Sequence, residues 1–199
     1  MDMKKYRDHY FLKAKQEAYP ARSVYKLKDI EKKFSLFRKG QCVLDLGAAP
    51  GSWTLYAAER VGKSGRVLGV DLQPVERDWP VQVSFFQGDL LNVDPALVAA
   101  LDQWAPFDVL LSDMAPQTSG IKLRDQTLSC ELARVAFECC SGYLAPGGSL
   151  VAKVFDGPDV PELISDMRRS FAKVKGFKPK SSREESKETF LLGFGHNLS

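Results

Sequence analysis

From residue 41 onward, short apolar runs alternate with longer segments in which apolar residues recur every three or four positions. Apolar runs bounded by turn residues are typical of buried strands, and the longer period is typical of amphipathic helices. The runs predict strands at residues 42–47, 66–72, 81–89, 107–113, 149–155, 173–180 and 188–195. The periodic segments predict helices at residues 52–62, 94–104, 125–145 and 160–172. Asp94 and Pro95 are expected to begin the second helix, and the "APGG" stretch to close the third.

Strands that alternate with helices predict right-handed crossovers, and therefore an α/β fold with a mostly parallel, seven-stranded sheet and helices on both faces. Ligands of such sheets lie beyond the carboxyl ends of the strands, where the strand order reverses. The polar positions expected at those ends are residues 45–51, Asp71, Asp89, Asp113 and Lys153. We therefore expect the functional site at this edge of the sheet.

The loop after the first strand, "GAAPG", restricts the kind of ligand that can bind there. Gly47 and Gly51 allow a tight turn and a close approach of the backbone to a ligand. The loop matches neither the G-x-G-x-x-G of dinucleotide binders nor the Lys-Ser/Thr of a P-loop. Asp71, twenty residues after Gly51, has the position of a carboxylate that accepts hydrogen bonds from ribose hydroxyls, although it could instead only cap a turn. A ribose-binding acid without a phosphate cradle favours S-adenosylmethionine as the cofactor, with Asp89 near the adenine.

Length and composition favour a single domain. The 199 residues, 44% of them hydrophobic, suffice for one core, and we divide them into a basic N-terminal arm (1–40) and a Rossmann-like core (41–199). No apolar run reaches the roughly 20 residues of a membrane span, and residues 1–15 lack the apolar centre of a secretory signal. We therefore expect a cytoplasmic protein, a monomer by default, whose four cysteines are reduced and form no metal site.

Positive charge gathers near both ends of the chain. Residues 1–40 contain twelve Lys and Arg against five Asp and Glu, and residues 168–187 contain eight against two. Two basic segments on either side of a mildly acidic middle favour a polyanion, such as nucleic acid, bound across a face that they share. Charge alone leaves open that both segments are simply solvated surfaces.

The order of short motifs along the chain resembles that of one family. The stretches "LDLGAAPGSW", "GVDL", "QGDL", "LLSDMAP" and "LVAKVF" look like successive motifs of the FtsJ family of ribosomal RNA 2′-O-methyltransferases, and "ARSVYKLKDI" and "SKETFLLGFG" are similar to the family's ends. The resemblance implies a Rossmann-like fold that uses S-adenosylmethionine. The cofactor residues that it and the loop analysis predict are Gly47, Gly51, Trp53, Asp71, Asp89 and Asp113. For Trp53, simple core packing is the competing interpretation.

The resemblance also implies a catalytic set of Lys26, Asp113, Lys153 and Glu188, which transfers a methyl group to a ribose 2′-hydroxyl. A hydroxyl is a poor nucleophile, so it has to be held in line with the methyl group and lose its proton as the bond forms. Lysine has an ordinary pKa of about 10.4 and accepts a proton at neutral pH only if burial or a neighbouring charge lowers that value. We expect Lys153 to be the proton acceptor, Asp113 and Lys26 its partners, and Glu188 a weaker contributor.

Three positions keep a simpler interpretation open or depart from the family pattern. Taken alone, Lys26 is better explained as a surface lysine of an amphipathic helix. Ser52 replaces a frequent glycine and could help to cap the helix that it begins. Phe190 replaces a frequent aromatic hydroxyl, so it would keep a stacking surface but lose a hydrogen bond to RNA.

The predicted partner is RNA, and the resemblance implies a uridine of 23S ribosomal RNA within the large ribosomal subunit. Both basic segments run into catalytic positions, as a groove that follows the phosphates would require. The residues are Lys4, Lys5, Arg7, Lys13, Lys15 and Arg22 before Lys26, and Lys178, Lys180, Arg183 and Lys187 before Glu188. The alternatives are a transfer RNA 2′-O-methyltransferase and a non-catalytic RNA-binding factor of ribosome assembly. A non-catalytic factor would be expected to lack one of the catalytic residues, and this sequence contains all four.

Overall fold

The computed structural model describes residues 3–183 and 186–197, and the side chains from residue 9 onward. Its strands are β1 (Cys42–Leu46), β2 (Arg66–Asp71), β3 (Val83–Gln87), β4 (Phe107–Ser112), β5 (Leu144–Phe155), β6 (Phe171–Phe177) and β7 (Glu188–His196). Its helices are α1 (Met3–Gln16), α2 (Val24–Phe34), α3 (Ser52–Val61), α4 (Pro95–Trp104), α5 (Lys122–Tyr143) and α6 (Val160–Ser170).

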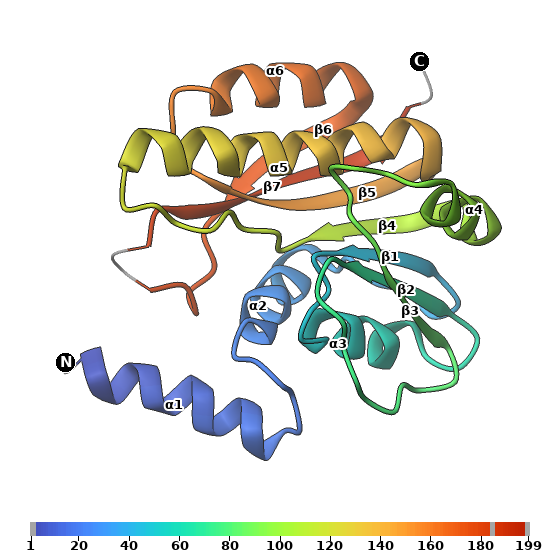
Figure 1. Ribbon diagram of the computed structural model, residues 1–199, viewed down its shortest axis with the longest axis horizontal. Helices are drawn as coiled ribbons and strands as arrows, with labels where there is room; N and C mark the ends of the chain where they lie inside the picture. The colour runs from blue at the N-terminus through green and yellow to red at the C-terminus, as the bar shows by residue number, and fades with distance from the viewer. Residues whose placement is uncertain (1–2, 184–185, 198–199) are drawn as a thin grey trace.

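All seven strands join one sheet, in the order β3-β2-β1-β4-β5-β7-β6 (Figure 1). Strands β1 to β5 pair in parallel, whereas β7 runs antiparallel to both of its neighbours, β5 and β6. The prediction of a mostly parallel, seven-stranded sheet is therefore confirmed. The strand order reverses between β1 and β4, which is where a ligand site is expected in such a sheet.

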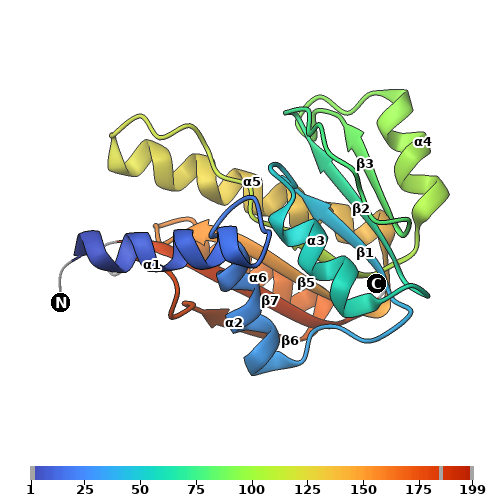
Figure 2. The same cartoon turned by 90° about the horizontal axis from the view of Figure 1, so that it is seen from below.

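Helices cover both faces of the sheet, as Figures 1 and 2 show from two sides. Successive side chains of a strand point to opposite faces of the sheet, so alternate residues of β1 contribute to the two cores. Leu44 and Leu46 pack with buried residues of α4, α5 and α6, while Val43 packs with those of α2 and α3. Each face thus has its own apolar core. None of the helices in the described part of the chain is long and apolar enough to cross a membrane.

Most boundaries differ from the sequence prediction by one to three residues, and the largest difference lies at the start of β5, which begins five residues earlier than predicted. Asp94 caps α4 as expected, since its carboxylate accepts the N–H of Leu97 at 2.7 Å. The "APGG" stretch, however, does not close a helix, because α5 ends at Tyr143 and β5 begins at Leu144. Leu144 is buried and pairs with Phe107, so tertiary packing makes this glycine-rich stretch the irregular start of a strand.

Two glycines allow a matched test of this packing. A Cβ added to Gly193 of β7 would come within 2.6 Å of the Phe171 ring, whereas one added to Gly142 of α5 would meet no atom within 4 Å. We expect Gly193→Ala to lower the free energy of unfolding by about 1–3 kcal/mol. Gly142→Ala should leave it unchanged or raise it by up to about 1 kcal/mol, because alanine favours helix. Urea unfolding of both variants measures this, and equal effects would contradict the described packing.

Candidate active site

Four charged side chains from four separate segments meet at the carboxyl ends of β4 and β5. The Nζ of Lys153, in β5, donates to the Oδ1 of Asp113 at 2.9 Å and to its backbone carbonyl at 2.6 Å. The Nζ of Lys26, in α2, lies 2.6 Å from the Oε2 of Glu188, the first residue of β7. The structure thus brings the four predicted catalytic residues together as two ion pairs, and Lys26 is not a surface lysine.

The pairing of β5 with β7 aligns these groups. Lys153 stands opposite Phe190, and Phe155 opposite Glu188. Residues two apart on a strand share a face, so the side chains of Lys153 and Glu188 leave the same side of the sheet. That side is the one covered by α2, which supplies Lys26.

Burial and charge set the ionisation of Glu188, which is only 8% exposed. Burial alone would raise the pKa of this carboxyl, but the charge and hydrogen bond of Lys26 and the charge of Lys153 act in the opposite direction. Together they hold the pKa of Glu188 below its usual value, so the group is a carboxylate at neutral pH. Glu188 therefore interacts with both lysines, and the two ion pairs act as one charged cluster.

On the other side of the strand-order reversal, Asp71 and Asp89 follow β2 and β3. The carboxylate of Asp71 accepts the backbone N–H groups of Ala49 and Gln73 at 2.9 and 2.7 Å, which ties the loop after β1 to the loop after β2. Asp89 accepts hydrogen bonds from Asn92 and from the N–H of Leu91, and these hold its pKa below the usual value. A carboxylate has about four acceptor positions, so both acids keep capacity for the hydroxyl and amine donors of a nucleoside.

Gly47 and Gly51 let the loop after β1 fit between two neighbours. Gly47 has φ +75°, and a Cβ there would come within 2.7 Å of Met114. Gly51 has φ +103°, and a Cβ there would come within 2.6 Å of the Trp79 ring. At both positions the positive φ favours glycine, and a neighbouring side chain already occupies the space that a Cβ atom would need. The acceptor carboxylates of Asp71 and Asp89, together with a glycine loop that lacks a phosphate-binding motif, fit a nucleoside cofactor without phosphates.

The sequence analysis gave no role to Trp79, which holds this loop in place. Its ring stacks on Phe85 of β3, with centroids 5.8 Å apart and planes 9° apart, and Arg77 lies over it at 5.1 Å. The signal for this contact was a large aromatic residue in an otherwise polar loop, "QPVERDWP". The contact with Gly51 depends on the tertiary fold and is not visible in that pattern.

Trp53 and Phe190 pack together in the core. Trp53 is 3% exposed, its Nε1 donates to the carbonyl of Ser23 at 2.9 Å, and its ring lies 5.7 Å from that of Phe190. A cofactor contact by Trp53 stays a prediction. Phe190 is fully buried, so the expectation that it offers a stacking surface to RNA is wrong.

Ser52 does not cap α3 through its side chain, because its Oγ accepts the N–H of Ala21.

Asp45 begins the stretch 45–51 that the sequence analysis placed at the ligand edge, but no particular role was predicted for it. It is fully buried near the carboxyl end of β1, and its Oδ2 accepts a 2.6 Å hydrogen bond from Thr54 of α3. Its Oδ1 is buried without a hydrogen-bond partner in the part of the chain that the structure describes. Burial, with a contribution from the charges of Asp113 and Asp71, raises the pKa of Asp45 to about 7. The signal in the sequence was an acid inside the apolar run "CVLDL".

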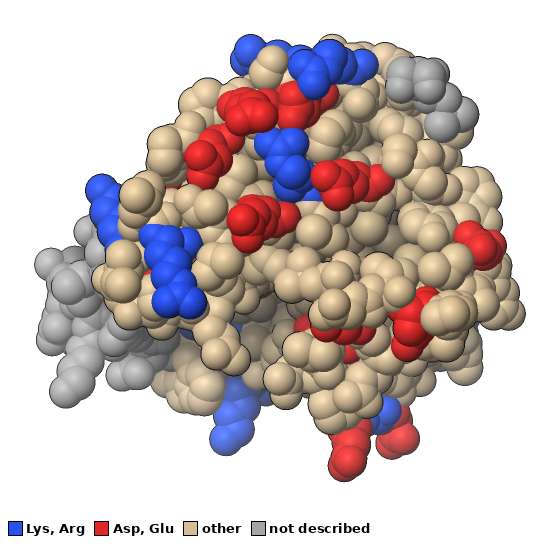
Figure 3. All heavy atoms as spheres, turned by 45° about the horizontal axis from the view of Figure 1, so that its top comes forward, with Lys and Arg blue, Asp and Glu red and all other residues tan. Residues whose placement is uncertain are grey.

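The two basic segments lie against each other beside the catalytic cluster. Arg22 donates to the carbonyl of Ser181, and the N–H and hydroxyl of Ser181 both donate to Asp29 of α2. The side chains of Lys4, Lys5 and Arg7 lie outside the described residues. On the side that carries α6, by contrast, acidic and basic side chains are interspersed (Figure 3), and Asp166 pairs there with both Arg134 and Arg169.

The sheet order, the reversed β7 and the acids at the strand ends together define a Rossmann-like methyltransferase. A family model described as FtsJ-like methyltransferase matches residues 19–196. The chain therefore belongs to the FtsJ-like methyltransferase family, whose members use S-adenosylmethionine in general.

Individual relatives agree with this family. The chain is 57% identical over 194 residues to the ribosomal RNA large subunit methyltransferase E of Nitratidesulfovibrio vulgaris strain DP4, covering 98% of this chain and 95% of the relative. It is 56% identical to the protein of the same name from Oleidesulfovibrio alaskensis, with 97% and 93% covered. A solved Plasmodium falciparum structure described as a ribosomal RNA methyltransferase superimposes with a TM-score of 0.75 at 29% identity, covering 90% of this chain and all of that one.

The raised pKa of Asp45 predicts a pH-dependent stability. The folded protein binds this proton more tightly than the unfolded chain, so the stabilisation is complete below about pH 4 and is lost as the pH rises through 7. Relative to Asp45→Asn, which cannot titrate, wild type should lose about 2 kcal/mol of unfolding free energy between pH 5 and pH 8. Urea unfolding of both proteins at the two pH values measures this difference. A difference that stays constant with pH would show that Asp45 is ionised throughout.

Proposed function

We propose that this protein transfers the methyl group of S-adenosylmethionine to a ribose 2′-hydroxyl of 23S ribosomal RNA, most simply a uridine in the large ribosomal subunit. One observation carries the proposal: a buried lysine, Lys153, is held by Asp113 beside the reversal in strand order. The names of the relatives that match nearly the whole chain support the choice of RNA. We further propose that the protein acts in the cytoplasm, where its substrate is found, and as a monomer.

The residues at the strand ends suit the cofactor. Asp71 would accept hydrogen bonds from the ribose hydroxyls and Asp89 from the adenine, while Asp113 would face the charged methionine part. The loop after β1 and the start of α3 would border the cofactor on this side, and they contribute Gly47, Gly51 and Trp53. When bound, S-adenosylmethionine supplies an electrophilic methyl group and leaves as a neutral thioether, so the reaction as proposed uses no metal.

The catalytic cluster would position the nucleophile and receive its proton. Asp113 holds the Lys153 side chain through two acceptors, which fixes the direction of the amine. The unprotonated amine of Lys153 would take the proton of the ribose 2′-hydroxyl as that oxygen accepts the methyl group that the cofactor supplies. Lys26, held by Glu188 at 2.6 Å, would complete the charged cluster beside Lys153 and help to position the substrate ribose. Glu188 keeps Lys26 in place and so acts through it.

Replacement of Lys153 tests this role. Lys153→Ala should lower kcat for methyl transfer by roughly 100-fold or more, because a positioned proton acceptor typically contributes 10²–10⁴-fold. Affinity for S-adenosylmethionine should stay within about threefold. The measurement is transfer of labelled methyl to large ribosomal subunits, with free ribosomal RNA and transfer RNA as parallel substrates.

Lys63→Ala is the matched control, since Lys63 is an exposed lysine in the turn between α3 and β2, outside both basic segments. It should retain wild-type activity. Full activity in Lys153→Ala would contradict the assignment of Lys153. A wild type that binds the cofactor but labels none of the three RNA substrates would contradict the proposed function itself.

Replacement of Asp71 tests the cofactor side. Asp71→Asn should weaken S-adenosylmethionine binding by roughly 10-fold, because it removes a charged acceptor for the ribose hydroxyls. Asp78→Asn, an exposed acid in the following loop, is the control and should bind normally. Isothermal titration calorimetry with the cofactor alone measures both, and equal affinities in the two variants would remove Asp71 from the cofactor site.

A further inference from the structure

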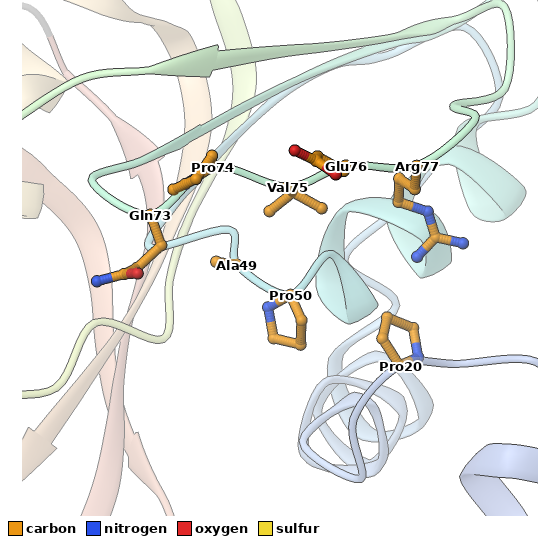
Figure 4. A pocket seen from close by; sticks show the side chains of 8 residues that line it. All are labelled: Pro20, Ala49, Pro50, Gln73, Pro74, Val75, Glu76 and Arg77. Atoms are coloured by element: carbon orange, nitrogen blue, oxygen red, sulfur yellow. The ribbon is translucent and has the colours of Figure 1, made fainter.

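A pocket of about 550 Å³ opens beside the loop after β1 and has no part in the site described above. Three segments line it: the connection between α1 and α2, the loop after β1, and the loop after β2 (Figure 4). The lining residues are Pro20, Ala49, Pro50, Gln73, Pro74, Val75, Glu76 and Arg77. A volume of this size is typical of pockets that hold a small organic molecule or a nucleotide.

The pocket adjoins the predicted cofactor site but is not lined by its acids. Neither Asp71 nor Asp89 nor Asp113 contributes to its wall. Asp71 accepts the N–H groups of Ala49 and Gln73, both of which line the pocket, so this carboxylate lies just behind one wall. The loop after β1 thus separates two binding regions.

The lining has the chemistry of a site for a flat molecule with polar edges. Three prolines, an alanine and a valine form apolar surfaces, and Gln73, Glu76 and Arg77 supply donors and acceptors. Figure 4 shows Arg77 reaching from the loop after β2 toward Pro20 and the start of α3. Its Nε is buried and has no hydrogen-bond partner within residues 3–183 and 186–197. The guanidinium is held over Trp79, so its position is fixed before any ligand arrives.

The pocket is connected to the catalytic cluster through one short segment. Pro20, on its wall, is followed by Ala21, which donates to Ser52 of α3, and by Arg22, which donates to Ser181. The same segment leads into α2, which carries Lys26. Ala21 and Arg22 thus tie the wall of the pocket to α3 and to the second basic segment, so RNA bound along the basic segments would lie close to the pocket.

We infer that the pocket binds an unpaired base of the RNA substrate, next to the nucleotide that is methylated. The inference rests on the proposed function and extends it. Proteins recognise single-stranded RNA by splaying bases out and stacking them on aromatic rings or guanidinium planes. An acidic Glu76 beside Arg77 disfavours a bare phosphate, whereas base edges offer donors for the carboxylate and acceptors for the guanidinium.

Two substitutions in the pocket test the inference. Arg77→Ala removes the guanidinium, and Val75→Asp places a charge on the apolar wall while it leaves the contact between Arg77 and Trp79 intact. Each should raise KM for large ribosomal subunits by roughly 5- to 150-fold, the range expected for the loss of one stacked base. The dissociation constant for S-adenosylmethionine, measured by calorimetry, should stay within about twofold and also shows that the variants are folded.

Arg66→Ala is the matched control. Arg66 also lies over a tryptophan, Trp104, at 5.3 Å, but at the opposite end of β2. Arg66→Ala should change neither KM for the subunits nor the dissociation constant for S-adenosylmethionine. An unchanged KM for the subunits in both pocket variants would overturn the inference and leave the proposed function intact, whereas weakened cofactor binding in both would assign the pocket to the cofactor. If wild type methylates no RNA, the proposed function fails, and the inference fails with it.

Discussion

The register between β5 and the antiparallel β7 is the constraint on which the catalytic cluster depends. It sets Lys153 opposite Phe190 and, two positions along, places Glu188 on the same face of the sheet. A shift of one residue would turn Glu188 to the other face, leave Lys26 without its partner and move Phe190 out of its contact with Trp53. The fully buried Phe190 therefore fixes the register that the charged residues need.

The site gathers charge in places where charge is costly to bury. Lys153 and Glu188 are less than 10% exposed, and each is paired with a group of opposite charge. Removal of one partner from such a pair leaves an unpaired buried charge, which is strongly destabilising. The cluster is therefore part of the fold as well as of the chemistry. It joins α2 to β7 across 162 residues of chain.

Much of this arrangement could be predicted from the sequence, because the signals are local. The period of apolar residues gives the strands and helices, and the acids that follow the strands mark the edge of the sheet. The "APGG" stretch was predicted wrongly because burial of Leu144 against β4 outweighs the local turn signal. The contacts of Phe190, Trp79 and Asp45 could not be predicted either, because they depend on the residues that the folded chain brings to them: Trp53, Gly51 and Thr54.

The loop after β1 contacts a different side chain at each end, and these contacts set its position between the cofactor region and the pocket. Gly47 leaves room for Met114, next to Asp113, and Gly51 leaves room for Trp79, under Arg77. One side of the loop thus faces the predicted cofactor region and the other forms a wall of the pocket. Because Asp71 accepts backbone N–H groups from two of the three segments that line the pocket, the position of the loop affects both regions. The glycines let the backbone of this shared loop pass close to Met114 at one end and to Trp79 at the other, where any side chain would collide.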